Sequence, residues 1–256
     1  MPTFGINIEV CVNATDRRAV SAAVAAACAG GAATVELCRD MHLEGLTPTP
    51  DLIEVARRTL GSRRGLMVMI RPRAGDFSYT LAERKTMRQQ ILDAGRAGAD
   101  GVVLGILRRA DSRVFREAMQ PLVETAAGIG LSTTFHRAFD AAPAALDALD
   151  EILQLGCQRL LSCGLPWGCS GSALDGTERL RQLVERAGQR LEVVIAGGVN
   201  PGNAAAILQR LATRTGRIAL HAYSGVHDQG HPTSASVAAL VDAVRTWEDS
   251  RPAATA

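Results

Sequence analysis

Two cysteines in this sequence each follow a glutamate by two positions. Glu9 and Cys11 stand in the segment INIEVCV, and Glu36 and Cys38 stand in ATVELC. Residues two positions apart lie on the same side of a β-strand, so each thiol is expected to share a side with its glutamate. Thiolates are the ligands that soft metal ions such as Cu(I) prefer. Cys11 and Cys38 are therefore candidate ligands for one copper ion, although buried cysteines more often serve packing alone.

A second group of side chains could perform acid–base chemistry. His136 and Asp140 lie in the segment TFHRAFD, and with Glu9 and Glu36 they form a set of proton donors and acceptors. We expect these four residues to be the catalytic groups if the protein is an enzyme. The same carboxylates and imidazoles, together with His221, could instead hold a hard divalent metal ion.

Arginines near these segments are suited to binding an anion. A guanidinium group matches the geometry of carboxylate and phosphate groups, and it alters the pKa values of nearby acids. Arg71 and Arg73 flank Pro72, so in an extended chain both can project to one side of the strand. One is expected to pair with a carboxylate and the other to bind an anionic ligand. The residues expected to bind a small anionic substrate such as a sugar phosphate are Arg71, Arg73, Asp76, Arg137, Ser162, Gly197, Gly198 and His221.

The segment AGGVNPGN, residues 196–203, adds a backbone feature to this expectation. Gly197 and Gly198 let amide groups approach a ligand closely, and Pro201 is expected to begin a helix whose N-terminus favours an anion. A Gly-Gly turn also serves an ordinary strand-to-helix connection, so this signal is the weaker one.

Short apolar runs recur along the whole chain and would position these residues. Their near-continuous Val, Ile and Leu content is typical of strands that are covered on both faces of a parallel sheet. Eight such runs, with helical patterns between them, predict an α/β fold with a single (β/α)8 TIM-type barrel of parallel strands. An open doubly wound sheet is the alternative. The runs are residues 6–12, 33–38, 65–72, 101–107, 131–139, 158–163, 191–198 and 217–224.

Helix start signals separate these runs. Asp16, Thr80 and Asp111 precede amphipathic segments as N-cap residues, and Pro201 suits a first turn. Pro121 falls inside the pattern that follows Asp111, so that helix is expected to kink or to start late.

In a barrel of this kind, reactive groups lie at the C-terminal ends of the strands and in the loops that follow them. The candidate residues obey that rule in the predicted strands, Glu9 and Glu36 included. A charge taken out of water costs several kcal/mol unless it is paired, so the candidates are expected to form one connected pocket. Individual members could equally be structural ion pairs that close the barrel.

Composition argues against several classes of protein. The 256 residues carry a net charge of +2 with no basic run, which argues against binding to nucleic acid or to a membrane surface. The N-terminus lacks the features of a signal peptide, so a cytoplasmic location with six free thiols is expected. No linker or low-complexity stretch divides the chain. Residues 1–250 are expected to form one domain, and residues 251–256 a disordered tail.

Several segments resemble the CutC family in their order and spacing. IRPRAGDFSY and TFHRAFD are the specific signals, and His221 on the last strand accompanies them. The resemblance implies a (β/α)8 barrel, a cytoplasmic location, homo-oligomerisation, and a role in copper homeostasis with copper binding. The segments are VELC (35–38), GLTP (45–48), IRPRAGDFSY (70–79) and TFHRAFD (134–140).

The sequence also departs from the family pattern. Leu43-Glu44-Gly45 stands where the family has Glu-Gly-Gly, so the loop carries a displaced carboxylate. Cys163 replaces a serine after the sixth strand, and Tyr223 replaces a small or hydroxyl residue after the eighth. These changes bear on the ligand more than on the fold. Copper binding and catalysis on a small anionic substrate both stay open, whereas a scaffold without a ligand would not need so many inward charges.

Overall fold

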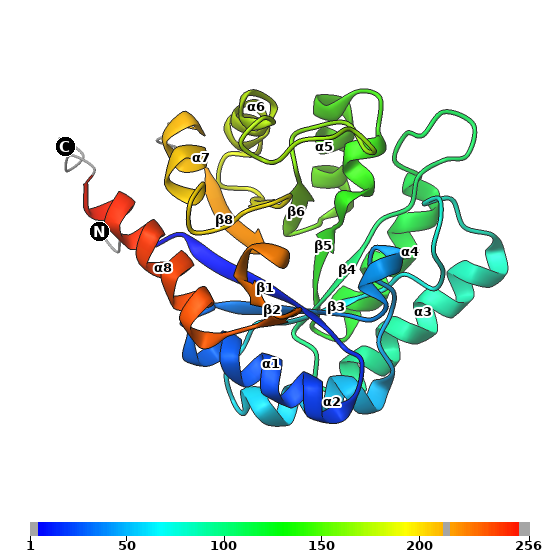
Figure 1. The fold of residues 1–256 in the computed structure, drawn as a ribbon. Helices are drawn as coiled ribbons and strands as arrows, with labels where there is room; N and C mark the ends of the chain where they lie inside the picture. Colours follow the sequence, from blue (N-terminus) through cyan, green and yellow to red (C-terminus); the bar gives the residue numbers. More distant parts are fainter. Residues whose placement is uncertain (1–4, 212–215, 251–256) are drawn as a thin grey trace.

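The chain forms a closed barrel of parallel strands surrounded by helices (Figure 1). The structure is a computed structural model that describes residues 5–211 and 216–250. The eight main strands hydrogen-bond in sequence order, and the last pairs with the first. The predicted (β/α)8 barrel is confirmed, and the open sheet is excluded. The tail expected at residues 251–256 lies outside the described residues.

Each predicted apolar run matches one strand of the barrel, and only β1 extends past its run, by one residue at Asn13. Most runs are longer than their strands because the apolar sequence continues past the strand into the hydrophobic core, as at Ile70, which is fully buried beyond β3. The strands are β1 (Asn7–Asn13), β2 (Thr34–Cys38), β3 (Leu66–Met69), β4 (Gly101–Leu104), β5 (Ser132–Phe135), β6 (Arg159–Ser162), β7 (Glu192–Ile195) and β8 (Arg217–Ala222). A separate two-stranded hairpin, β9 (His227–Asp228) and β10 (His231–Pro232), follows the barrel.

The register of β1 places its polar residues at two different depths. Cys11 lies opposite Glu36 of β2, whereas Glu9 lies opposite Thr34 of β2 and His221 of β8. Adjacent strands of a closed barrel are shifted relative to one another along the barrel axis. The third residue of one strand therefore does not lie opposite the third residue of the next. Cys11 and Glu36 therefore share a level of the barrel that Glu9 does not reach.

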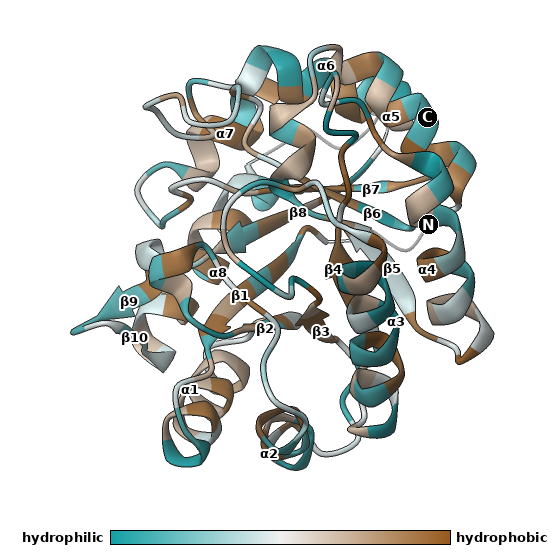
Figure 2. Ribbon diagram, turned by 90° about the vertical axis from the view of Figure 1, so that its right-hand side faces the viewer, coloured by the Kyte–Doolittle hydropathy of each residue, from teal (hydrophilic) through white to brown (hydrophobic). Residues whose placement is uncertain are grey.

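The helices pack their apolar faces on the barrel and expose hydrophilic residues outward (Figure 2). They are α1 (Arg17–Ala29), α2 (Pro50–Leu60), α3 (Leu81–Arg96), α4 (Arg116–Gly128), α5 (Ala145–Leu155), α6 (Thr177–Ala187), α7 (Ala204–Leu211) and α8 (Ser234–Asp249). Within the described ranges, none of them is long and apolar enough to cross a membrane.

Two predicted caps are confirmed and two helix starts are displaced. Asp16 accepts a hydrogen bond from the Ala19 amide, and Thr80 forms a capping box with Glu83. The helix after Asp111 begins only at Arg116, the late start that its internal proline predicts. The helix expected at Pro201 begins at Ala204 instead, because Asn200 and Asn203 hold the preceding residues in side-chain-bonded turns.

Candidate functional site

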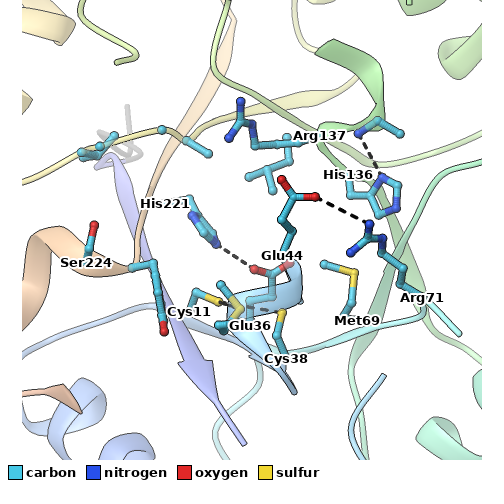
Figure 3. Close-up of a pocket in the computed structure, with 18 of the residues that line it drawn as sticks. Cys11, Glu36, Cys38, Glu44, Met69, Arg71, His136, Arg137, His221 and Ser224 are labelled. Atoms are coloured by element: carbon cyan, nitrogen blue, oxygen red, sulfur yellow. Dashed lines mark hydrogen bonds and ion pairs between the residues drawn. The ribbon is translucent and has the colours of Figure 1, made fainter. Parts of the chain in front are cut away.

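A cavity of about 290 Å³ lies at the C-terminal ends of the barrel strands (Figure 3). Nine of the fourteen residues predicted as site residues line it. These are Cys11, Glu36, Cys38, Arg71, His136, Arg137, Gly197, Gly198 and His221. The other five predicted residues, Glu9, Arg73, Asp76, Asp140 and Ser162, lie outside its lining.

One side of the cavity gathers sulfur atoms. The Cys11 Sγ atom lies 3.8 Å from Cys38 Sγ and 3.9 Å from Met41 Sδ. Cys11 belongs to β1, Cys38 ends β2, and Met41 begins the 3₁₀ helix η1 (Met41–Leu43). We call these three residues the sulfur cluster. Met69 also lines the cavity and packs with the two cysteines in one buried group.

A glycine allows the sulfur cluster to close. Gly45 has a φ of +85°, and a Cβ atom there would come within 3.3 Å of Met41 Sδ and 3.4 Å of Cys38 Sγ. Any larger residue would be strained by its backbone and would press on both sulfur atoms. Met41 and Met69 were missed by the sequence reasoning, because a thioether in an apolar environment is usually a packing residue. The only local signal was the position of Met41, three residues after Cys38.

Both thiols of the cluster are protonated at neutral pH. The hydrogen bond to Cys38 and burial raise the pKa of the Cys11 thiol well above its usual value. For Cys38 the hydrogen bond from Cys11 favours the thiolate, but burial and the nearby Glu36 carboxylate raise the pKa to about 11. A metal ion that binds thiolates here must therefore displace their protons.

An ion pair lies directly beside the sulfur cluster. His221 Nε2 is 2.7 Å from Glu36 Oε2, and both side chains are buried. Burial disfavours the charged form of both side chains, but each is stabilised more strongly by the opposite charge of the other. The pKa of Glu36 is therefore lowered, and the pKa of His221 is raised well above its usual value. Cys11, Glu36 and His221 can each offer one ligand atom, and these three atoms lie within 4.8 Å of one another. Glu36 Oε1 is buried and has no hydrogen-bond partner among the described residues.

Arg71 forms the opposite wall and is almost completely buried. Its guanidinium donates to the carbonyl oxygens of Leu43 at 2.7 Å, Gly45 at 3.2 Å and Gly75 at 2.9 Å. Its carboxylate partner is Glu44, whose oxygen lies 3.7 Å away. The predicted pairing of Arg71 with a cavity carboxylate is thus present, but that contact is long.

The prediction that Arg73 shares this cavity with Arg71 is wrong. Arg73 turns away from it, donates to Asp76 at 2.8 Å and forms an ion pair with Glu83. Glu83 is fixed by its capping box with Thr80 at the start of α3, and this fixed carboxylate draws Arg73 outward. Asp76 is therefore a partner of Arg73 and not a cavity residue.

His136 lines the cavity as a neutral imidazole. Its Nδ1 accepts a hydrogen bond from the Ala138 amide, so the neutral ring carries its proton on Nε2. Nε2 is buried and has no hydrogen-bond partner in the part of the chain that is described. Burial, and then the nearby Arg71 charge, lower the pKa of His136 to about 3. A ring with this pKa is a weak general base at neutral pH, but its Nε2–H can donate to a ligand.

The low pKa of His136 predicts a loss of stability in acid. A folded-state pKa below the ordinary value of 6.5 means that the unfolded chain binds the proton more tightly. The stabilisation is complete above about pH 6.5 and is lost as the pH falls toward about 3. Between about pH 7 and pH 4 the free energy of unfolding should fall by about 3 kcal/mol more than in His136→Asn, which keeps an acceptor for Ala138 but does not titrate. Urea unfolding at both pH values measures this difference, and equal losses in the two proteins would refute it.

Asp140 and Ser162 position a neighbour and do not line the cavity. Asp140 accepts hydrogen bonds from Ser162 Oγ at 2.6 Å, the Cys163 amide at 3.1 Å and Arg137 Nε at 2.9 Å. The Arg137 guanidinium also lies over the Trp167 ring, 5.2 Å from its centroid. Asp140 thus fixes the direction in which Arg137 reaches the cavity.

The Gly-Gly turn serves packing more clearly than anion binding. A Cβ atom at Gly197 would lie 2.5 Å from Cys163 Sγ, so a glycine is needed there to pack on the neighbouring loop. With α7 starting only at Ala204, no helix begins at Pro201 to direct its N-terminus at a ligand. Gly197 and Gly198 line the cavity, but the helix argument for an anion at this loop is wrong.

The prediction that Glu9 lies at a strand end is also wrong. It is the third residue of β1, is buried inside the barrel, and accepts hydrogen bonds from Arg159 at 2.6 Å and from Thr34 Oγ1 at 2.9 Å. Arg159 also bonds Glu192 at 2.7 Å. Glu9 therefore belongs to a buried ion triad, Glu9–Arg159–Glu192, and not to the cavity.

Comparisons with known proteins place this chain in a family. A model of the CutC family matches residues 6–226. A CutC family protein of Caulobacter vibrioides is 40% identical to this chain over 215 residues, which cover 84% of the chain and 81% of the relative. A CutC family protein of Vibrio cholerae is also 40% identical, over 214 residues that cover 84% of the chain and 78% of the relative.

Solved structures agree with this match. The CutC protein of Streptococcus agalactiae, provisionally named a copper homeostasis protein, has a crystal structure that matches this one with a TM-score of 0.71. The two sequences are 31% identical, and the match covers 84% of this chain and 98% of that protein. Tryptophan synthase subunit alpha from Legionella pneumophila is 14% identical with a TM-score of 0.63, covers 94% of this chain and 93% of its own, and shares the fold alone. The family match, the 40% identical relatives and the shared barrel lead to one conclusion: this chain belongs to the CutC family.

Proposed function

We propose that this protein binds one Cu(I) ion through Cys11 and Cys38, with Met41 as a third sulfur donor, and that it serves copper homeostasis in the cytoplasm. The observation that carries the proposal is the convergence of three sulfur atoms, with Cys11 Sγ at 3.8 Å from Cys38 and 3.9 Å from Met41. The name of the Streptococcus agalactiae relative supports the same function. A homo-oligomeric state remains a prediction from the family.

The spacing of the two thiols suits a shared metal ion. Two sulfur atoms bound at about 2.3 Å to one ion, with a tetrahedral angle between them, lie about 3.8 Å apart. The Cys11–Cys38 distance is 3.8 Å, so no backbone movement is needed to admit the ion. Soft Cu(I) favours such thiolate and thioether donors.

The charges beside the sulfur cluster also favour a bound cuprous dithiolate. Two thiolates and one Cu(I) ion carry a net charge of −1, and a buried negative charge needs a cation nearby. His221 is held in its charged form beside Cys11, where its imidazolium offsets that charge.

A site for a hard divalent metal ion, the alternative to copper, is less well supported. Its expected ligands are dispersed, since Glu9 pairs with Arg159 and Asp140 with Ser162 and Arg137. The mixed set of Cys11, Glu36 and His221 resembles the ligands of zinc more than those of magnesium or calcium. Zinc is therefore the metal against which copper must be tested.

The test is a titration of reduced, metal-free protein with Cu(I) in the absence of oxygen, with a chromogenic Cu(I) chelator as competitor. We expect one tightly bound equivalent, and X-ray absorption of the complex should show two or three sulfur neighbours at about 2.3 Å. A complex ligated by nitrogen and oxygen alone would overturn the proposal. So would a Zn(II) ion that Cu(I) fails to displace from the site.

The raised thiol pKa values predict a steep pH dependence of copper affinity. Both Cys11 and Cys38 are protonated at neutral pH, so each bound ion releases two protons. The apparent affinity should therefore rise about 100-fold for each pH unit between about pH 6 and pH 8. The same chelator competition, repeated across this range, measures the slope. A tenfold slope would leave only one thiolate as a ligand, and a flat profile would exclude both.

A further inference from the structure

The cavity has a second wall that the proposed copper site does not use. Arg71 and Arg137 line it, and we call them the arginine wall. Figure 3 shows the Glu44 side chain reaching from its loop into the space between this wall and the Glu36–His221 pair. A cavity of about 290 Å³ is also far larger than a single metal ion needs, and approaches the size of small-molecule sites.

The positive charge of Arg71 is poorly neutralised. Its side chain is 2% exposed, and its hydrogen bonds go to carbonyl oxygens, which carry no net charge. Its carboxylate partner is Glu44 at 3.7 Å, and the Glu44 side chain is 59% exposed. A buried cation is stabilised much more by a close anion than by a distant, hydrated one. The arginine wall is therefore suited to binding a further negative charge close to Arg71.

Hydrogen-bond donors around the same space also lack partners. Arg137 is held through Nε by Asp140, and within the described residues its two terminal nitrogens make no hydrogen bond. His136 Nε2, which carries the proton of the neutral ring, is buried without a partner in the described part of the chain, as is Arg71 Nε. Buried donors without partners are rare and indicate a missing ligand or water.

An unused acceptor faces the same cavity from the other side. Glu36 Oε1 is buried and accepts no hydrogen bond from the described residues, while Oε2 is occupied by His221. A carboxylate oxygen of this kind suits a ligand hydroxyl group. Donors for an anion on one wall and an acceptor for a hydroxyl on the other define a ligand that carries both groups.

We propose that the cavity binds a small hydroxylated oxyanion, a carboxylate or phosphate bearing a hydroxyl group, whose anionic end takes the place of the Glu44 carboxylate on the arginine wall. Glu44 is then an internal competitor that the ligand displaces. Its own position permits this, because only its exposed side chain has to move. The Leu43 and Gly45 carbonyls on either side of it stay bonded to Arg71.

The test uses the full-length, copper-free protein and four probes: glycerol 3-phosphate, glycerate, inorganic phosphate and glycerol. Calorimetric titration and thermal melts should show binding of at least one of the first two, weaker binding of phosphate, and none of glycerol. Glu44→Gln should bind that probe about fivefold more tightly, because an exposed like charge costs up to about 1 kcal/mol. Arg137→Lys should bind it more weakly, because lysine keeps the charge but loses the planar guanidinium group that can donate two hydrogen bonds to one oxyanion.

Glu117→Gln on α4 is the matched control, since it removes the same charge from an exposed position on the outer ring of helices. Its affinity should equal that of the wild type. The proposal is overturned if neither hydroxylated anion binds, or if Glu44→Gln binds no more tightly than Glu117→Gln. Equal affinity for phosphate and for glycerol 3-phosphate would refute the hydroxyl contact assigned to Glu36. Since copper is absent throughout, these outcomes are independent of the Cu(I) proposal.

Discussion

Replacing Arg159 with methionine is expected to lower the free energy of unfolding by about 3 to 5 kcal/mol. Arg159 is 7% exposed and bonds two carboxylates inside the barrel, Glu9 at 2.6 Å and Glu192 at 2.7 Å. Both carboxylates are themselves buried. Methionine fills much of the same volume, so the loss comes from two buried carboxylates that lose the cation they share, with only the half-exposed Arg217 left 4.0 Å from Glu192.

Urea unfolding of purified protein measures this effect. The triple variant Arg159→Met/Glu9→Gln/Glu192→Gln should recover most of the loss, because it removes the stranded charges along with their partner. Arg181→Met is the control: Arg181 also pairs with two carboxylates, Glu178 and Glu185, but on the exposed face of α6, where solvent screens the charges and the loss of stability should be much smaller. If Arg159→Met costs no more than Arg181→Met, the buried triad does not stabilise the barrel.

Glu9 shows why the members of the site could not all be predicted from the sequence. The patterns Glu9-x-Cys11 and Glu36-x-Cys38 are identical along the chain, and both glutamates are the third residue of their strands. The barrel stagger sets Cys11, not Glu9, opposite Glu36. The stagger is a property of closure around all eight strands, so no local pattern reveals it.

The fold itself was predictable because its signals are local and repeated. Continuous apolar runs and glycines recur along the chain, N-cap residues mark several of the helices, and each run matches one strand of the barrel. The side chains of Arg71 and Arg73 were harder to place. Both follow β3, but Arg73 is drawn outward by Glu83, ten residues later, and this competition depends on where α3 begins.

The ligand-binding chemistry was predictable only in part. The residues Cys11, Cys38, Glu36 and His221 do come together, since each lies near the C-terminal end of its strand. Met41 joins them because the loop after β2 turns back over the strand, with Asp40, Glu44 and Gly45 all at positive φ. Asp40 and Glu44 are not glycines, so a backbone of this kind is hard to anticipate from residue types.

The double variant Cys11→Ser/Cys38→Ser is expected to lose Cu(I) affinity by at least about 1,000-fold, a change of about 4 kcal/mol. A serine hydroxyl is a hard donor that stays protonated, so neither position could supply the soft anionic ligand that Cu(I) requires. Met41 would remain as a neutral thioether, beside Glu36 and His221. Met41→Leu alone should weaken binding far less, since both thiolates are kept.

Chelator competition under reducing, oxygen-free conditions measures all of these affinities. Cys28→Ser/Cys169→Ser is the matched control, because it removes two thiols that lie outside the cavity, one half-buried and one exposed. It should retain the full equivalent of bound Cu(I), which would exclude general thiol content as the source of binding. Circular dichroism and urea unfolding of each variant establish that the barrel is intact before its affinity is compared. A folded Cys11→Ser/Cys38→Ser protein that still binds one equivalent as tightly as the wild type would locate the copper site elsewhere, because among the described residues Cys11 and Cys38 are the only thiols that line the cavity.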